Sequence, residues 1–266
     1  MSSSQPIGFF DSGVGGISVM KEVRRLLPVE DLLYFADSLY CPYGNKSPEL
    51  IRQRARLISS FLLSLGAKMI VVASNTTSVA ALNEVRQSIG VPVVGTEPAV
   101  KPATCATRNG RIGVLATGVT LAGERFNSLV ERFGEGVEVY TQPCPGLVET
   151  VEAGRLEHPD TEELLRGYLD RLLSQGVDTI VLGCTHYPFL RPLIEKLVGD
   201  GVTVIDTGQA VAKQVYRVLE SHDLLNPHQA SGREHFYTST HNPVSTQQVI
   251  RQLWKDPHLT VKSIYI

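Results

Sequence analysis

The sequence predicts an α/β fold made of two similar domains, each with a mostly parallel sheet flanked by helices. Short apolar runs alternate with segments of helical period along most of the chain, and this alternation is typical of parallel strands joined by helical crossovers. Parts of the first half also recur in the second half. A chain of 266 residues with 42% hydrophobic and 20% charged residues has an ordinary globular composition.

The candidate strands are short apolar runs, each flanked on both sides by residues typical of turns or helices. One helix in between, Ser18–Leu27, has apolar residues at helical spacing and stops before Pro28. A longer helix has Ser47 as its N-cap, a proline at its first position, and a glycine after its end at Leu65. The expected strands are Pro6–Phe10, Leu32–Ala36, Met69–Ala73, Val91–Gly95, Arg111–Ala116, Glu138–Thr141, Thr179–Gly183 and Val202–Asp206.

Segments of the first half align with segments of the second at a nearly constant separation. Ser74 and the strand before it fall on Cys184 and its strand, 110 residues later. The aligned pairs are Leu62–Thr76 with Leu172–His186, Ile7–Val14 with Ile112–Val119 at a separation of 105, and Val91–Val100 with Val202–Val211 at 111. We therefore expect two halves related by a pseudo-twofold axis, with an active site in the cleft between them.

The predicted domain boundaries follow from this repeat. The first domain comprises residues 1–97 and 210–266, and the second comprises residues 98–209. The C-terminal segment is expected to return to the first domain, because Gln214–Leu219 continues a helix and Trp254 lies in another helical pattern. Its irregularly spaced histidines are interpreted as surface or local structural residues and not as metal ligands; they are His222, His228, His235 and His241.

Charge and cysteine usage argue against several classes of protein. A net charge of −2 and a pI near 6.4 build no basic field for nucleic acid, and we interpret Arg52, Arg54 and Arg56 as the solvated side of a helix. The sequence shows no apolar run of membrane-spanning length and no signal-peptide pattern. The cysteines lack zinc or disulfide-framework spacing, which favours a reduced, cytoplasmic protein; they are Cys41, Cys105, Cys144 and Cys184.

Polar residues follow the aligned strands in both halves. Ligands of open parallel sheets bind beyond the carboxyl ends of the strands, so these residues are candidates for a site. If the halves face each other across a cleft, Ser74 and Cys184 approach one ligand from opposite sides. The first half contributes Asp11, Ser12, Ser74, Asn75 and Thr76, and the second contributes Thr117, Cys184, Thr185 and His186.

Two opposed acid–base groups are what a racemase without a cofactor requires, because one group removes a proton and the other returns one to the opposite face. A thiol suits this work, since its ordinary pKa of about 8.5 leaves some thiolate near neutral pH. We expect a helix N-terminus after Cys184, near Pro188, to favour the thiolate, and His186 to orient it. The alternative is that Cys184 is a small buried hydrophobe, and we assign that role to the other cysteines.

The segment Asp11–Gly16 looks like a phosphate loop but lacks its spacing. No third glycine falls at position 18, which is a serine, and no Gly-Lys-Ser/Thr run follows. The Asp11 carboxylate would repel a phosphate and fits an ammonium ligand or an acid–base partner better. Gly15 and Gly16 are interpreted as a tight strand-to-helix turn.

Together these residues closely resemble the glutamate racemase family over Ile7 to about Val211. The motifs that carry the resemblance are Phe10-Asp-Ser-Gly-Val-Gly-Gly16, Pro42-Tyr-Gly44, Ala73-Ser-Asn-Thr76, Pro145-Gly-Leu-Val-Glu-Thr-Val-Glu152 and Gly183-Cys-Thr-His-Tyr-Pro188. The resemblance implies two α/β domains, commonly a homodimer, no metal or pyridoxal phosphate, and production of D-glutamate for peptidoglycan.

The resemblance also implies roles for individual residues. Ser74 and Cys184 would occupy the two acid–base positions, with Asp11 supporting the first. Glu152 and His186 would support the second, although Glu149 stands one turn away from Glu152. The substrate would be held by Asp11, Ser12, Pro42, Tyr43, Gly44, Asn75, Thr76, Thr117, Thr185 and His186. Such hydroxyl, amide and backbone N–H groups suit an acidic amino acid.

Ser74 departs from the family, which has a cysteine at this position. A hydroxyl is far less acidic than a thiol, so we predict normal folding and binding with severely impaired racemisation. The chain is then a site-directed variant or a natural paralogue with lost or changed activity, and the single change in a matching site favours the first. Two other functions stay open: a glutamate-binding regulatory protein, and a one-thiol relative such as a decarboxylase.

Overall fold

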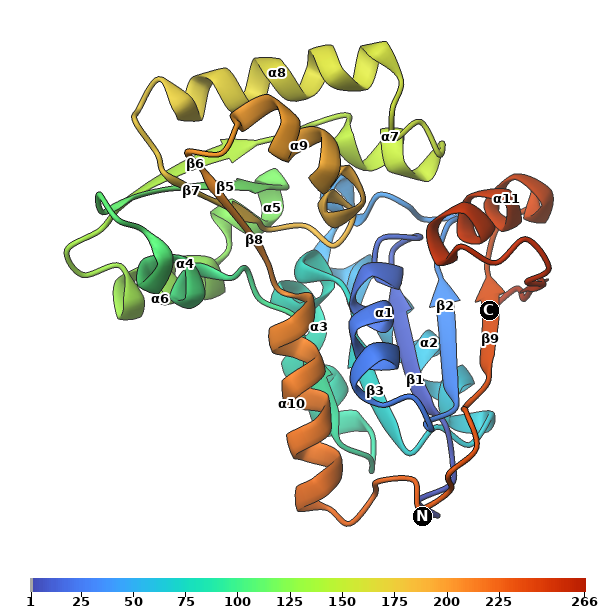
Figure 1. Cartoon of the computed structure of the whole chain (residues 1–266). Coiled ribbons are helices and arrows are strands. Elements are labelled where there is room, and N and C mark those ends of the chain that lie inside the picture. Colours follow the sequence, from blue (N-terminus) through green and yellow to red (C-terminus); the bar gives the residue numbers. More distant parts are fainter. Residues whose placement is uncertain (1) are drawn as a thin grey trace. The chain divides into compact units, whose positions relative to one another are not determined.

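The computed structural model describes residues 2–266, which divide into two compact units with one parallel sheet each. Unit 1 holds residues 2–96 and Gly208–Ile266, and unit 2 holds Glu97–Thr207. The first sheet has the order β10-β9-β2-β1-β3-β4 and the second the order β6-β5-β7-β8. The strands are β1 Ile7–Asp11, β2 Leu32–Ala36, β3 Met69–Val72, β4 Val93–Gly95, β5 Arg111–Ala116, β6 Glu138–Pro143, β7 Thr179–Leu182, β8 Thr203–Asp206, β9 Glu234–Thr238 and β10 Val261–Ser263 (Figure 1).

The strand register confirms the internal repeat. Ile7 pairs with Met69 between β1 and β3, and Ile112 pairs with Thr179 between β5 and β7. The separations of 105 and 110 residues found in the sequence map the first pair onto the second. Since the order β2-β1-β3-β4 also matches β6-β5-β7-β8, the predicted fold of two similar α/β domains with parallel sheets is confirmed.

Helices cover both faces of the sheet in unit 1. Successive side chains of a strand point to opposite faces of the sheet. All residues of β1 and β2 are buried, so both faces of the sheet are covered at these strands. Helices α1, α10 and α11 pack together on one face, and α2 and α3 pack together on the other (Figure 1). Their bounds are α1 Ile17–Leu26, α2 Pro48–Ser64, α3 Asn75–Ser88, α10 Gly208–Ser221 and α11 Pro243–Trp254, with the 3₁₀ turn η1 at Tyr43–Asn45.

Unit 2 repeats this layering without the two additional edge strands. Helix α4 packs on α6 as α10 packs on α1, and α8 with α9 covers the opposite face (Figure 1). The bounds are α4 Val100–Ala106, α5 Gly118–Ala122, α6 Glu124–Phe133, α7 Leu147–Glu152, α8 Pro159–Leu173, α9 Arg191–Val198 and the 3₁₀ turn η2 Tyr187–Leu190. The core under α4 and α6 is apolar and includes Ile112, Val114, Phe126, Leu129 and Val181.

The residues predicted to begin and end helix α2 do so in the structure. The Ser47 hydroxyl accepts a hydrogen bond from the Leu50 N–H at 3.3 Å, and Pro48 occupies the first helical position. Gly66, just beyond the helix, has a φ of +88°, a left-handed conformation that favours glycine. These local signals therefore predicted both ends of helix α2 to within one residue.

The interpretation of the α2 arginines as one solvated row was wrong for Arg54. Arg52 and Arg56 are partly exposed, but Arg54 is 2% exposed and forms an ion pair with Asp37 at 2.8 Å. A charged side chain can be buried when its donors are paired, and Asp37 supplies that pairing.

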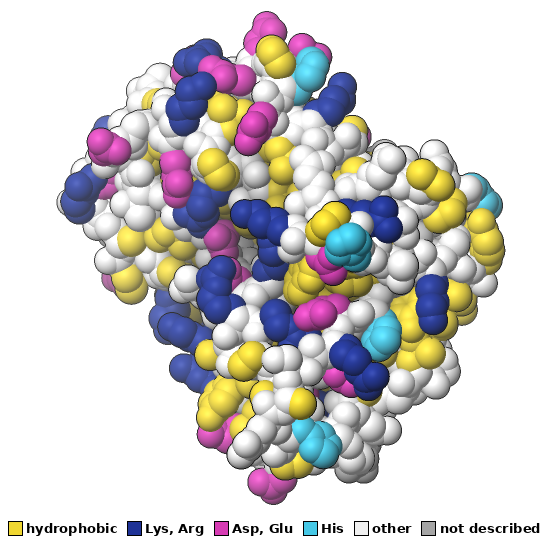
Figure 2. All heavy atoms as spheres, turned by 45° about the vertical axis from the view of Figure 1, so that its right-hand side comes forward, with side chains coloured by type: hydrophobic (Ala, Val, Ile, Leu, Met, Phe, Trp, Pro, Cys, Tyr) yellow, Lys and Arg dark blue, Asp and Glu magenta, His cyan; other side chains and the backbone are white. Residues whose placement is uncertain are grey.

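The surface carries charges of both signs. Figure 2 shows Lys and Arg side chains interspersed with Asp and Glu on the face that it presents. Among residues 2–266, no helix combines the length and apolar character that a membrane crossing needs.

Candidate active site in two half-sites

The unit 1 half-site lies at the carboxyl ends of two neighbouring strands. Asp11 is the last residue of β1, and Ser74 follows β3, which pairs directly with β1. The five predicted residues at these strand ends are all buried: Asp11, Ser12, Ser74, Asn75 and Thr76. Unit 1 therefore brings these predicted residues together.

The Asp11 carboxylate organises the loop that follows its own strand. One oxygen accepts a hydrogen bond from the Ser12 N–H at 2.6 Å, and the other accepts one from the Gly16 N–H at 2.7 Å. Gly16 has a φ of −62°, so it is not required for a left-handed turn. A Cβ at Gly16 would instead lie 2.8 Å from the Ala73 Cβ, and glycine therefore allows this loop to approach the end of β3.

Ser74 is the N-cap of helix α3. Its hydroxyl accepts a hydrogen bond from the Thr77 N–H at 3.3 Å, and the 14-residue helix begins at the next residue. Serine is among the preferred N-cap residues. The positive end of a helix would favour a negative charge at this position.

The loop after β2 carries the third group of predicted residues in unit 1: Pro42, Tyr43 and Gly44. Tyr43 is 1% exposed, and its hydroxyl donates a hydrogen bond to Asp37. Burial, with the charge and hydrogen bond of Asp37, raises the pKa of the Tyr43 phenol well above its ordinary value. The Tyr43 hydroxyl is therefore held by Asp37.

The unit 2 half-site occupies the equivalent strand ends. Thr117 follows β5 and caps helix α5, where its hydroxyl accepts a hydrogen bond from the Thr120 N–H at 3.3 Å. Cys184, Thr185 and His186 follow β7, the neighbour of β5, and are all buried. The half-sites thus use corresponding positions of the repeated fold.

A line of three side chains connects Cys184 to a carboxylate. The Cys184 sulfur lies 3.7 Å from His186 Nδ1, and His186 Nε2 lies 2.7 Å from a carboxylate oxygen of Glu152. If His186 carries its proton on Nε2, that N–H donates a hydrogen bond to Glu152, and Nδ1 can accept the proton of the thiol. Glu152 is the last residue of α7, whereas Glu149 is exposed to solvent.

The expectation that an α-helix begins near Pro188, after Cys184, was wrong. Residues Tyr187–Leu190 form a 3₁₀ turn, and helix α9 begins only at Arg191. The misleading signal was Pro188, because Pro192 is the proline in the first turn of α9. Cys184 is therefore supported by the His186–Glu152 pair, whereas position 74 has a helix N-terminus.

Cys144 is a second buried thiol in unit 2, and its environment suppresses its ionisation. The thiol donates a hydrogen bond to the Gln142 carbonyl at 3.2 Å. Burial, followed by the nearby Cys184, raises the pKa of Cys144 to about 12. A thiol with this pKa is almost entirely protonated at pH 8.

The interpretation of Cys105 as a small buried hydrophobe was wrong, because this residue is exposed. Alkylation should therefore distinguish Cys105 from the buried Cys144. With iodoacetamide at pH 8, the native protein is expected to label Cys105 rapidly and Cys144 at least about a hundredfold more slowly. Raising the pH toward 11 should increase Cys144 labelling, because its thiolate fraction grows about tenfold per pH unit below its pKa. Peptide mass mapping over time measures both rates, and equal labelling at pH 8 would contradict the assigned pKa.

The chain is similar in sequence to known racemases over most of its length. Residues 7–215 match the family described as Asp/Glu/Hydantoin racemase. The glutamate racemase of Ectopseudomonas mendocina (strain ymp) is 57% identical over 227 residues, which cover 85% of this chain and 86% of that protein. The glutamate racemase of Pseudomonas aeruginosa PAO1 is 51% identical over 262 residues, 98% of each chain.

A solved relative agrees in three dimensions. The crystal structure of Escherichia coli glutamate racemase, in complex with L-glutamate and the activator UDP-MurNAc-ala, is 30% identical with a TM-score of 0.86, and the match covers 98% of each chain. Fold, motifs and sequence identity therefore agree: this chain belongs to the Asp/Glu/Hydantoin racemase family and, within it, to the glutamate racemases.

Proposed function

We propose that this chain binds L- and D-glutamate and that positions 74 and 184 serve opposite faces of the substrate α-carbon. The observation that carries the proposal is the line from Cys184 through His186 to Glu152, at the strand end that corresponds to Ser74. The Escherichia coli relative was solved with L-glutamate and a Francisella tularensis relative with D-glutamate, which supports the substrate.

The reaction begins at Cys184. His186 accepts the thiol proton, Glu152 stabilises the imidazolium that forms, and the thiolate removes the α-proton of L-glutamate. The C–H electron pair stays on the substrate as a carbanion. Inversion then requires a proton donor on the opposite face, where a thiol at position 74 would act.

Ser74 interrupts the second half of this reaction. Giving up its proton would create an alkoxide, and a hydroxyl is a far weaker acid than a thiol. The Asp11 oxygens already accept loop N–H groups, and a carboxylate is a poor base for so weak an acid. The carbanion is therefore reprotonated by Cys184 on its original face, and racemisation is severely impaired.

The same resemblance supports further parts of the proposal. Motifs shared with racemases that supply D-glutamate for peptidoglycan favour that role for an active form of this chain. A cytoplasmic homodimer without metal or pyridoxal phosphate is proposed on the same ground.

A regulatory protein that binds glutamate without turnover is the second candidate, and Ser74 is the observation that favours it. Incubation with L-glutamate in heavy water distinguishes the two. If our proposal is correct, deuterium appears at the α-carbon of L-glutamate and little D-glutamate forms. NMR measures the deuterium, and chiral chromatography measures the D-glutamate. Binding without any exchange would support the sensor, release of CO₂ would support a decarboxylase, and absence of glutamate binding would overturn the proposed substrate.

A further inference from the structure

A single buried carboxylate gathers several segments of unit 1 beside the half-site. Asp37 directly follows β2 and is 0% exposed, and the Arg54 guanidinium of helix α2 contacts both of its oxygens, at 2.8 and 2.9 Å. The Ser239 hydroxyl, just after β9, donates a hydrogen bond to it at 2.7 Å. The Tyr43 hydroxyl donates another. Asp37 therefore joins the loop after β2 to a helix and to the end of another strand.

The same network reaches the residues assigned to substrate binding. The Asp37 N–H donates a hydrogen bond to the Asp11 carbonyl at 3.0 Å, at the end of β1. The Arg54 guanidinium also stacks over the Tyr40 ring, 4.2 Å from its centroid, and donates a hydrogen bond to the Ile266 carbonyl. Arg54 and Asp37 thus contact two side chains of the loop after β2, the Tyr40 ring and the Tyr43 hydroxyl.

Burying two charges is costly and is not required to cover this edge of the sheet. Apolar residues of similar volume would stabilise a protein at least as well in many cases. A charge pair with bidentate geometry does provide a fixed direction, because a guanidinium and a carboxylate align in one plane. The Asp37–Arg54 pair therefore suits precise placement of Tyr43 better than it suits simple stability.

We propose that Asp37 is a positioning residue of the unit 1 half-site, which with Arg54 anchors the Tyr43 hydroxyl and so holds the Tyr43–Gly44 backbone in place for glutamate. The inference rests on the proposed function. Asp37 does not touch the substrate; it acts through Tyr43. No motif in the sequence marked it, although it directly follows β2, whose last residue pairs with Asp11 at the end of β1.

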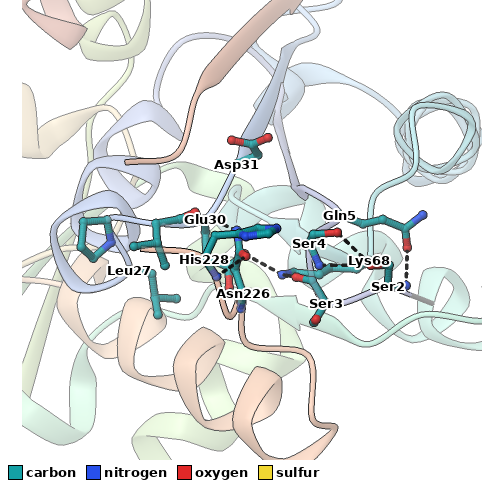
Figure 3. A network of polar contacts seen from close by, with 12 residues as sticks. Ser2, Ser3, Ser4, Gln5, Leu27, Glu30, Asp31, Lys68, Asn226 and His228 are labelled. Carbon is teal, nitrogen blue, oxygen red and sulfur yellow. Dashed lines mark hydrogen bonds and ion pairs between the residues drawn. The ribbon is translucent and has the colours of Figure 1, made fainter. Parts of the chain in front are cut away.

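Unit 1 offers a matched control at the opposite ends of its strands. Glu30 and Lys68 form an ion pair at 2.6 Å with both side chains 0% exposed. The Asn226 N–H donates a hydrogen bond to Glu30 at 2.8 Å, and Lys68 donates one to the Ser3 carbonyl (Figure 3). Lys68 precedes β3 and Glu30 precedes β2, so this pair lies at the amino ends of the strands, away from the residues assigned to substrate.

The experiment compares Asp37→Asn and Tyr43→Phe with Glu30→Gln, all in the chain with Ser74. Calorimetry with L-glutamate gives the Kd, and thermal unfolding gives the Tm of each variant. Tyr43→Phe removes only a hydroxyl, and we expect about tenfold weaker binding with little change in Tm, because loss of position is costly even when packing survives. We expect Asp37→Asn to weaken binding about tenfold to a hundredfold and to lower the Tm. Glu30→Gln should lower the Tm comparably and leave the Kd unchanged.

The same three changes in a Ser74→Cys background separate position from general stability. The two loop variants should raise KM more than they lower kcat, and Glu30→Gln should change neither by more than about twofold. Unchanged Kd in Tyr43→Phe, or equal weakening by Glu30→Gln, would overturn the role of Asp37. If the parent chain does not bind glutamate, the proposed function is wrong. If the parent chain binds glutamate and the loop variants bind it equally well, only the role of Asp37 is wrong.

Discussion

Replacing Ser74 by cysteine is expected to raise the formation of D-glutamate from L-glutamate by several orders of magnitude. In the proposed mechanism the change supplies the missing acid on the second face of the α-carbon, since an ordinary thiol has a pKa of about 8.5. Position 74 is the N-cap of the 14-residue helix α3, whose positive end favours a thiolate. A gain of about a thousandfold or more corresponds to at least about 4 kcal/mol of barrier.

The same substitution should slightly lower stability. Serine caps α3 through the Thr77 N–H, and loss of an N-cap typically costs about 1 kcal/mol. Activity and stability therefore move in opposite directions, which a simple improvement in folding would not produce. A coupled assay for D-glutamate and a denaturant titration measure the two effects.

Ser78→Cys is the matched control, because Ser78 is also buried in α3, one turn further along. Its hydroxyl lies 3.3 Å from that of Thr96. A thiol there should leave the rate of racemisation at the level of the parent. A folded Ser74→Cys protein that binds glutamate but forms no D-glutamate would disprove the two-thiol mechanism.

The repeated part of the fold was readable from the sequence because its signals are local. The strands β1 to β8 are apolar runs with turn or helix signals at their ends, and the predicted bounds agree with the structure to within two residues. The two strands β9 and β10, which extend the first sheet beyond β2, were not predicted. Strand β9 begins with Glu234 and His235, and β10 has three residues, so long-range pairing with β2 and β9 defines them more than their own composition.

The site was predictable where it follows from strand ends and not where it depends on distant partners. Alignment of the halves placed Ser74 and Cys184 at equivalent positions. The family resemblance named Glu152 with Glu149 one turn away, and the contact of Glu152 with His186 in the fold distinguishes the two. Arg54 lies between two partly exposed arginines, and its partner Asp37 precedes it by 17 residues, so no local pattern identifies the pair.

Replacing Cys184 by alanine should abolish the exchange of the L-glutamate α-proton in heavy water. In the proposed mechanism Cys184 is the one thiol of the acid–base pair, and its loss removes the base outright. Glu152→Gln is expected to slow exchange by about a hundredfold or more, because a positioned general base contributes about 10² to 10⁴. A neutral amide at position 152 no longer stabilises the imidazolium of His186, which lies 2.7 Å away.

Glu149→Gln provides the comparison one turn away on α7, where the carboxylate is exposed and should leave the exchange rate unchanged. Exchange that persists in Cys184→Ala, or equal rates in the two glutamine variants, would show that the proton is taken by a group other than the Cys184–His186–Glu152 line.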